Sequence, residues 1–432
     1  MWYEMNLTPT RTARIFPRHL SLVVAGKSKP SFMVRSLKKM EPSTITTYKY
    51  SKHYEKVFNF TRVISEICGA DVVREDYKMT WVTWSLIGLV NGAIAFTFYT
   101  MYVGVAINND WSEILKCLCM FCTGLQAYAK LINGLKCKDK FCFLHNEING
   151  IYSTYELKTK NYHKLLKQSI SLVKKLISIL LGIVILVSIA IVGTPIFYML
   201  FFKERIFIMP FLFPYIDYTT DFGYYFTSAV HVVCVFFGAF GNFVSDSWCF
   251  VFAAHIPLIK DILQAKFKEL DTILEEEAPD ADKVMDLLMD IFKWHQKYIV
   301  FCNTVKNLFF WVIFVQVSME FVSIVCTIVC IFLGIWPAAP VFLVYSFVLF
   351  YFHCALGNLV ETSNDDVISM IYDCCWYNLS VSQQKMLLIM LRESQQAEGM
   401  SIGGVAPLSM STALQLTKTI YTFSMMFREF LN

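Results

Sequence analysis

Residues 361–432 read ETSNDDVISMIYDCCWYNLSVSQQKMLLIMLRESQQAEGMSIGGVAPLSMSTALQLTKTIYTFSMMFREFLN, and this stretch decides how the rest of the chain is interpreted. A helical stripe over residues 382–395 stops before Gly403, Gly404 and Pro407. These residues interrupt a helix because glycine frees the backbone and proline lacks an amide donor. A second helix is predicted over residues 408–430, just long enough to cross a bilayer.

This second helix is unusually polar for a membrane crossing. Its polar side chains are Ser409, Ser411, Thr412, Gln415, Thr417, Lys418, Thr419, Thr422 and Ser424. Intramembrane polar groups normally face protein or water rather than lipid. The pattern therefore favours a helix that lines a pore. The alternative is an amphipathic helix lying on the membrane surface.

Composition places the whole chain among membrane proteins. Of its 432 residues, 56% are hydrophobic and only 17% are charged, whereas a soluble protein has about a quarter charged residues. The net charge of +4 is too small to argue for a nucleic-acid partner. No signal peptide is expected, because the early apolar run is shorter than the usual hydrophobic region, so the first span would direct insertion.

We predict an all-α polytopic fold with seven crossings, at residues 80–103, 112–135, 176–202, 226–254, 308–335, 338–360 and 408–430. Around these spans the chain divides into five parts. A cytosolic tail, 1–79, is disordered to about residue 51 and then forms a short helix over 54–69. Spans one to four occupy 80–254, a cytosolic helical extension 255–307, spans five and six 308–360, and an anchor segment with the last helix 361–432.

Loop charge predicts the orientation. The connection over residues 136–175 is rich in lysine and the N-terminal tail is basic, whereas 104–111 and 334–337 have no Lys or Arg. The positive-inside rule then places the N-terminus in the cytosol, and seven crossings place the C-terminus outside. The sequons at Asn6, Asn59 and Asn378 fall on the cytosolic side and are expected to stay unglycosylated.

The sequence has no phosphate-binding, nucleophile-elbow, zinc-protease or dinucleotide motif, so we expect no enzyme activity, catalytic residue, metal or cofactor. Cys117, Cys119 and Cys122 lie in an apolar helix and are interpreted as packing residues. Glu320 is the anomaly, because a carboxylate in mid-membrane needs a partner or a neutral state. An inter-helix hydrogen bond and a functional role are equally open for it.

Other polar residues in the apolar spans are given structural roles. His231 and His353 are interpreted as satisfied structural imidazoles, and Asp246 and Glu361 as ties between helices near the cytosolic ends of their spans. Aromatic residues crowd the connection from the third span to the fourth. They are typical of an interface belt and would also suit a mostly apolar pocket for a small organic ligand.

The tail resembles the C-terminal pattern of the insect odorant receptors. The matching residues are Glu361, Ser363, Tyr372, Trp376, Gly403 or Gly404, Pro407, Leu408, Ser409 and the group 421–424. Tyr-Thr-Phe-Ser at 421–424 departs from the Tyr-Ser-Tyr-Phe that is usual there. Further matches are Asp246, His255, Gln316 and Cys326. The likeness covers about residues 54–432.

This resemblance implies a ligand-gated cation channel of four subunits in the plasma membrane of olfactory sensory neurons. Cytosolic ends of the later helices would form an anchor domain, and the final helix would line the pore. The family's obligate co-receptor has a longer loop between its fourth and fifth spans. The short loop here implies an odorant-binding subunit that forms a heterotetramer with that co-receptor, with membrane lipid around it.

The resemblance also suggests site residues. A small volatile organic ligand would bind in the outer half of the spans, where the candidates are Phe121, Ile191, Tyr198, His231, Cys234, Phe342 and Tyr345. Each of these is equally compatible with core packing. Met426, Glu429 and Phe430 would face the outer pore, and the spacing from Met426 to Phe430 keeps both on one helix face.

Three rival functions stay open from the sequence. An insect gustatory receptor shares the architecture, but its last span usually has a Gln-Phe where this chain has Arg428, Glu429 and Phe430. A G-protein-coupled receptor would need an external N-terminus. A membrane enzyme or transporter has no catalytic motif in its favour.

Overall fold

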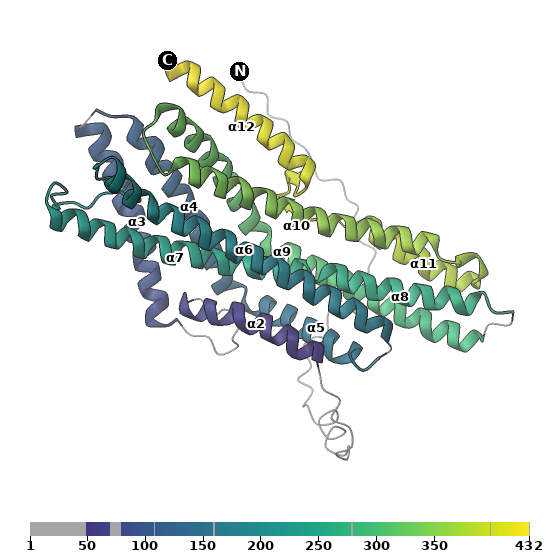
Figure 1. Ribbon diagram of the computed structural model, residues 1–432. Helices are drawn as coiled ribbons and strands as arrows, with labels where there is room; N and C mark the ends of the chain where they lie inside the picture. The colour runs from purple at the N-terminus through teal and green to yellow at the C-terminus, as the bar shows by residue number, and fades with distance from the viewer. Residues whose placement is uncertain are drawn as a thin grey trace, which may run out of the picture. The chain divides into compact units, whose positions relative to one another are not determined.

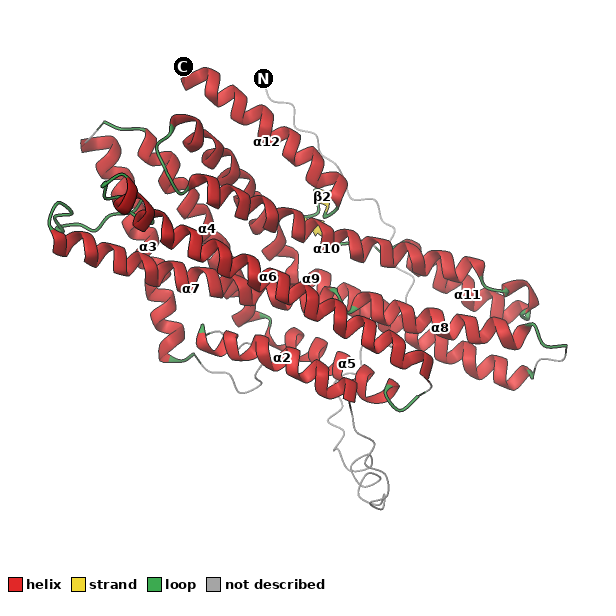
Figure 2. Ribbon diagram, viewed as in Figure 1, coloured by secondary structure: helices red, strands yellow, loops and turns green. Residues whose placement is uncertain are grey.

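The computed structural model describes residues 49–69, 79–107, 109–158, 160–277, 280–397 and 399–431. This part of the chain is almost entirely helical, as the all-α prediction requires (Figure 2). Residues 1–48, most of the tail that was expected to be disordered to about residue 51, lie outside the described residues, as do residues 70–78 before the first span; residues 49–51 are helical and begin α2.

The elements follow one another as labelled in Figure 1. They are α2 (Lys49–Ile67), α3 (Trp81–Tyr102) with a π-helical turn (Val103–Ile107), α4 (Ser112–Lys136), α5 (Lys138–Tyr155), α6 (Lys160–Phe201), α7 (Asp221–Ala253), α8 (Ile256–Leu274), α9 (Ala281–Leu333), α10 (Ala339–Asp373), a 3-10 turn (Trp376–Asn378), α11 (Val381–Gln395), β1 (Ser401–Ile402), β2 (Ala406–Pro407) and α12 (Met410–Leu431).

Six helical segments in the described part of the chain are long and apolar enough to cross a membrane. They are Trp81–Ile107, Ser112–Lys136, Lys160–Phe201, Asp221–Leu274, Ala281–Leu333 and Ala339–Asp373. They correspond to the first six predicted spans. Helix α12 falls below this measure because its many polar residues lower its hydropathy, so its crossing stays a prediction.

Several helices extend well beyond their apolar spans. The chain between the fourth and fifth spans is helical, since α8 follows α7 almost directly and α9 begins at Ala281; that this extension lies in the cytosol stays a prediction. Helix α6 begins at Lys160, much earlier than its apolar run, because Leu166, Val173 and Ile177 keep a buried stripe at helical spacing through the lysine-rich stretch. The apolar run alone therefore marks only the membrane part of this helix.

Helix α9 forms the centre of the bundle and packs against α4, α8, α10 and α12. Its buried side chains run from Val284 to Cys330, nearly its whole length. Helices α2 and α5 lie side by side at one flank, where Tyr54 stacks on Tyr152 with ring centroids 5.0 Å apart (Figure 1). The buried core is therefore continuous from the membrane-length part of α9 into the extension made by α8 and α5.

Helix α3 is packed much more loosely than its neighbours. Its only buried side chains are Thr83, Thr97 and Thr100, and none of its large apolar residues is buried. Trp81 is 88% exposed and Trp84 58% exposed. A helix that is apolar on all sides yet buries only threonines leaves room between itself and the bundle, and a cavity occupies that room.

A tight hairpin joins α11 to α12. Strands β1 and β2 pair antiparallel, and Gly403 and Gly404 between them have φ angles of +61° and +76°, a region that side-chain-bearing residues avoid. The hairpin lies against α10 at Gly357, where an added Cβ atom would approach the Leu408 carbonyl oxygen to 2.0 Å. The helix break predicted at this place is confirmed. Glycine is required at 357 by the close approach of Leu408 and at 403 and 404 by the positive φ angles of the turn.

Candidate ligand-binding site

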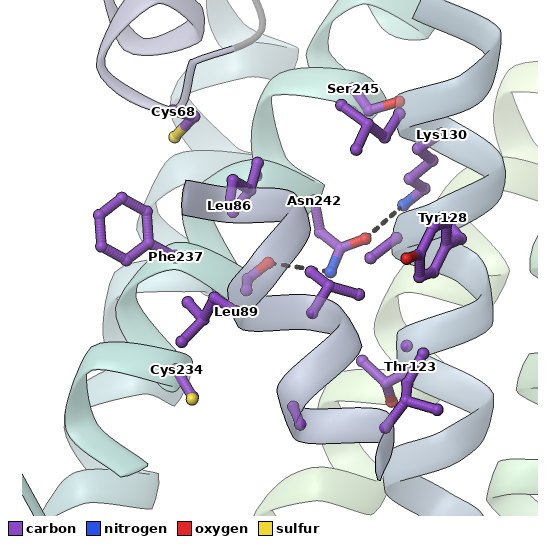
Figure 3. Close-up of a pocket in the computed structure, with 18 of the residues that line it drawn as sticks. Cys68, Leu86, Leu89, Thr123, Tyr128, Lys130, Cys234, Phe237, Asn242 and Ser245 are labelled. Carbon is purple, nitrogen blue, oxygen red and sulfur yellow. Dashed lines mark hydrogen bonds between the residues drawn. The ribbon is translucent and has the colours of Figure 1, made fainter. Parts of the chain in front are cut away.

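A cavity of about 180 Å³ lies between α3, α4 and α7 and is closed at one end by the loop that precedes α7. Most of its wall is apolar, with Leu89 and Ala93 from α3, Met120 from α4, and Phe237 from α7. Figure 3 shows Leu89, Cys234 and Phe237 gathered on one side of this space. A concave, mostly apolar cavity with few polar groups is the usual form of a small-molecule site.

Polar residues interrupt the apolar wall, among them Thr123 and Lys130 of α4 and Asn242 of α7. The Lys130 ammonium donates to Asn242 Oδ1 at 3.1 Å, and the Asn242 amide donates to the Gly238 carbonyl at 2.9 Å (Figure 3). Lys130 is only 6% exposed. A lysine so deeply buried needs charged or polar partners, because desolvation of an ammonium is costly.

Those same three residues also line a second, much smaller cavity of about 20 Å³ between α4, α7, α9 and α10. Its other walls are largely polar and comprise Gln126, Gln316, Glu320, Ser323, Phe342, Tyr345, Ser346 and Leu349. The two cavities therefore share a polar boundary made by Thr123, Lys130 and Asn242, which we call the partition. The large cavity on one side of it is mostly apolar, and the small cavity on the other side is largely polar.

A network of buried charges stands behind this partition. Lys130 Nζ lies 2.7 Å from Asp246 Oδ1, and His353 Nε2 lies 3.4 Å from the same oxygen. Gln316 donates to Glu320 Oε2 at 3.1 Å. All four ionisable side chains are buried. Ion pairs link α4, α7 and α10, and Gln316 and Glu320 of α9 line the small cavity, so the buried polar groups beside the partition come from four helices.

Several roles assigned from sequence are confirmed here. Asp246 does tie helices together. Glu320 accepts its hydrogen bond from Gln316 of the same helix, α9, so the inter-helix bond that was one of its two open roles is not the contact formed here. His231 is fully buried, with Nε2 3.0 Å from the Phe211 carbonyl and Nδ1 3.5 Å from the Met209 amide. Since Met209 donates and Phe211 accepts, a neutral imidazole protonated at Nε2 satisfies both contacts. His231 thereby holds two residues of the loop that closes the large cavity.

The other predicted ligand-binding residues are divided between the two cavities and places outside them. Cys234 lines the large cavity, and Phe342 and Tyr345 line the small one. Phe121 instead packs edge-on against Phe98 of α3, with ring centroids 5.2 Å apart. The two remaining candidates lie on α6, which contributes no residue to either cavity: Ile191 and Tyr198, whose ring contacts Phe202.

Sequence reasoning missed the three residues that make the partition, Thr123, Lys130 and Asn242. A signal was present, because a lysine several residues inside an apolar span is an intramembrane charge that marks a functional site. The three packed cysteines give no such site. They are buried, and among the described residues no group of His, Cys, Asp or Glu side chains is arranged to hold a metal ion.

Helix α12 has a packed face and an opposite polar face. Ala413, Ile420 and Ser424 are buried against the bundle, and the Tyr351 hydroxyl lies 2.9 Å from Thr417 Oγ1. The exposed stripe opposite this face contains polar residues at helical spacing, namely Ser411, Gln415, Lys418, Thr422 and Glu429. Among the pore candidates, Met426 is 54% exposed and Glu429 is exposed, and the side chain of Phe430 lies outside the described part of the structure.

Six membrane-length helices, three of which line an apolar cavity, define the class, a multi-pass membrane protein. A family model described as 7tm Odorant receptor matches residues 110–421. The chain belongs to this odorant receptor family and is therefore a receptor of olfaction, whose ligands are small odorants, rather than an enzyme.

Individual relatives agree with this assignment. Odorant receptor 83c of Drosophila melanogaster is 26% identical over 397 residues, which are 88% of this chain and 98% of that protein. Odorant receptor 22b of the same fly is 21% identical over 53% of this chain and 58% of its own length. These matches separate the chain from the gustatory and enzyme alternatives.

The fold is that of solved insect olfactory receptors. The receptor OR5 of Machilis hrabei superposes with a TM-score of 0.69 over 87% of this chain and 98% of its own, at 13% identity. Its complex with eugenol gives a TM-score of 0.66 over 88% of this chain and all of the other. At this identity the likeness concerns the fold alone.

Proposed function

We propose that the chain is the odorant-binding subunit of a heteromeric ligand-gated cation channel in the plasma membrane of olfactory sensory neurons. The observation that carries the proposal is the apolar cavity of about 180 Å³ beside a charge network that reaches α9 and α10, the helices on which α12 packs. Ligand binding and the last helix are thus connected through contacts within one subunit.

Gating follows from differential affinity. A volatile ligand that fills the large cavity binds better to the arrangement of α3, α4 and α7 that fits it, and shifts the equilibrium toward that arrangement. The network transmits the shift to α9 and α10, and α12 moves with them. A hydrophobic constriction near Met426 and Phe430 then opens, and the polar stripe of α12 borders the ion path.

The short connection between α8 and α9 supports the assignment to the odorant-binding rather than the co-receptor type of subunit. We infer that the partner is the odorant co-receptor in a tetramer. The ligand class, a small volatile organic molecule, is consistent with the related OR5 structure, which was solved with eugenol. The pocket residues Cys234, Phe342 and Tyr345 would contact the ligand or close the site around it.

The test is co-expression with the co-receptor in cells, followed by a panel of volatiles and recording of inward current. We expect at least one volatile to open a current that neither subunit produces alone. Cell-surface labelling provides the control for delivery to the membrane. A labelled, assembled complex that passes no current under any stimulus would contradict the proposal.

A second experiment tests the role of α12. Cysteine introduced at Gln415 or Thr422 on the polar stripe should react with a charged thiol reagent and block ligand-evoked current, because water would reach these positions. Cysteine at Ile420 on the packed face is the matched control and should be protected. The receptor without an introduced cysteine measures background from its own thiols, and equal reaction at all positions would exclude a pore-lining stripe.

A further inference from the structure

The small cavity has more hydrogen-bonding capacity than the protein uses. Gln316 Oε1 and Ser323 Oγ are both buried and have no hydrogen-bond partner among the described residues. Each residue is 2% exposed, and both line the cavity. Leaving a buried polar atom unsatisfied costs about 1–3 kcal/mol. Two such atoms facing one space indicate that something polar occupies it.

Lys130 adds a donor at the partition. An ammonium has three N–H groups, and those of Lys130 have two protein partners among the described residues, Asn242 Oδ1 and Asp246 Oδ1. One N–H is therefore available in the partition that borders both spaces. The ammonium is held in place by these two contacts, so the remaining donor has a fixed position.

The two volumes set the size of what can bind. A closed apolar cavity of about 150 Å³ is known to take benzene, so the large cavity of about 180 Å³ accepts a ring with a short substituent. The small cavity of about 20 Å³ holds one water molecule or one group of similar size, such as a hydroxyl or carbonyl. It is too small for a carbon skeleton.

The charges nearby determine the kind of polar group. The partition and the small cavity bring one lysine together with two carboxylates, Asp246 and Glu320. A carboxylate ligand would meet these two acidic groups, and an amine would meet the fixed ammonium of Lys130. A neutral group that both donates and accepts, or that only accepts, avoids both repulsions.

We propose that the receptor recognises a neutral, ring-sized apolar molecule with a single hydroxyl or carbonyl, whose oxygen accepts from Lys130 and, directly or through one water, reaches Ser323 and Gln316. This inference rests on the proposed function, since it names the ligand class of the same site. The apolar body fills the large cavity and supplies most of the affinity. The polar group selects among molecules of equal size.

The experiment measures binding by the stabilisation of the purified receptor against heat, which does not depend on channel opening. The probes are 2-phenylethanol, acetophenone, propylbenzene and 2-phenylethylamine, which all have the same number of non-hydrogen atoms, about nine, and so are close to the size the cavity accepts. We expect 2-phenylethanol and acetophenone to bind about five- to tenfold more tightly than propylbenzene, the effect of one hydrogen bond. We expect the amine to bind more weakly than the alcohol.

Variants locate the polar contact. Ser323→Ala removes a hydroxyl with no protein partner, so the fold should tolerate it, and it should reduce the preference for 2-phenylethanol over propylbenzene severalfold. Ser188→Ala on α6, remote from both cavities, is the matched control. Trp248→Phe removes a different unpartnered donor, the buried indole N–H of a residue that lines the large cavity instead. If that change abolishes the preference and Ser323→Ala does not, the polar site is misplaced and the inference fails.

The remaining outcomes are equally decisive. Equal stabilisation by 2-phenylethanol, acetophenone and propylbenzene, stronger binding of the amine, or no stabilisation by any probe at its solubility limit would overturn the inference. Selective binding with no ligand-evoked current beside the co-receptor would leave the ligand class standing and contradict the channel proposal instead. The two ideas can therefore fail separately.

Discussion

Lys130 lies inside a membrane-length helix and is only 6% exposed, and its ammonium is paired with the Asp246 carboxylate, with 2.7 Å between Nζ and Oδ1. Replacing Lys130 by Met leaves the Asp246 carboxylate buried without its main partner, and such a loss costs about 3–5 kcal/mol. We expect Lys130→Met to lower the melting temperature of the purified receptor by several degrees. Adding Asp246→Asn should recover most of the loss, since the uncompensated charge is then removed.

The control for this pair is Lys164→Met, which removes an exposed lysine of α6. Surface ion pairs contribute little, so this change should leave the melting temperature within experimental error. If Lys130→Met melted like the unchanged receptor, Asp246 would have to be protonated or solvated and the network would not tie the helices.

His145 provides a prediction about pH at the α2–α5 contact, outside the membrane-length helices. Its ring stacks on Phe58 with centroids 3.7 Å apart, and Nδ1 lies 3.1 Å from the Tyr54 hydroxyl. Burial, with a smaller contribution from the Arg62 charge, lowers the pKa of His145 to about 4. The folded state therefore keeps this imidazole neutral, whereas the unfolded chain protonates it near pH 6.5.

The unfolded state binds the extra proton between these two values, so stability should fall as the pH is lowered from about 6.5 to 4 and should be fully present above that window. His145→Gln should flatten this part of the curve of melting temperature against pH. His53→Gln, at an exposed position of α2, is the control. An unchanged slope in His145→Gln would show that another group titrates there.

At the scale of the elements, the contact between α10 and the hairpin before α12 leaves no room for an added side-chain atom. An added Cβ at Gly357 would lie 2.0 Å from the Leu408 carbonyl oxygen, and backbone cannot rotate away as a side chain does. We expect Gly357→Ala to destabilise the receptor by about 1–3 kcal/mol, the usual effect of overpacking. It should also displace α12 and reduce ligand-evoked current at a given surface level.

Gly182→Ala on α6 is the matched control, because a Cβ there meets no atom within 4 Å. It should be neutral or stabilising by up to about 1 kcal/mol, since alanine favours a helix more than glycine does. A Gly357→Ala receptor with unchanged stability and current would mean that the hairpin does not seat on α10.

Sequence patterns predict the local elements of this fold but not their tertiary packing. Helices over 382–395 and 408–430 and the glycine break between them follow from local chemistry, and α11, α12 and the hairpin confirm them. The loose packing of α3 could not be foreseen, because an apolar helix looks the same whether protein or lipid covers it. Lys130 and Asn242 meet only when α4 and α7 are brought together, a tertiary event that spacing within one helix does not encode.

At the scale of the whole molecule, the number of crossings determines where the ends lie. If α12 crosses the membrane after the six apolar helices, the termini are on opposite sides, with the N-terminus in the cytosol as the lysine-rich connection predicts. An epitope tag at residue 1 should stain only after permeabilisation, and a tag after residue 432 should stain on intact cells. An externally exposed N-terminus would favour the topology of a G-protein-coupled receptor.

The loose seating of α3 has a consequence for how the receptor meets its stimulus. Three threonines are the only fully buried side chains of this helix, Leu89 and Ala93 line the cavity, and several of its large apolar residues are exposed on the outer side. The bilayer itself then adjoins the cavity across one weakly held wall. We expect odorants dissolved among the acyl chains to enter the cavity laterally, from the bilayer. The oil–water partition coefficient of an odorant, and not its aqueous concentration alone, would then govern how quickly a response rises and decays.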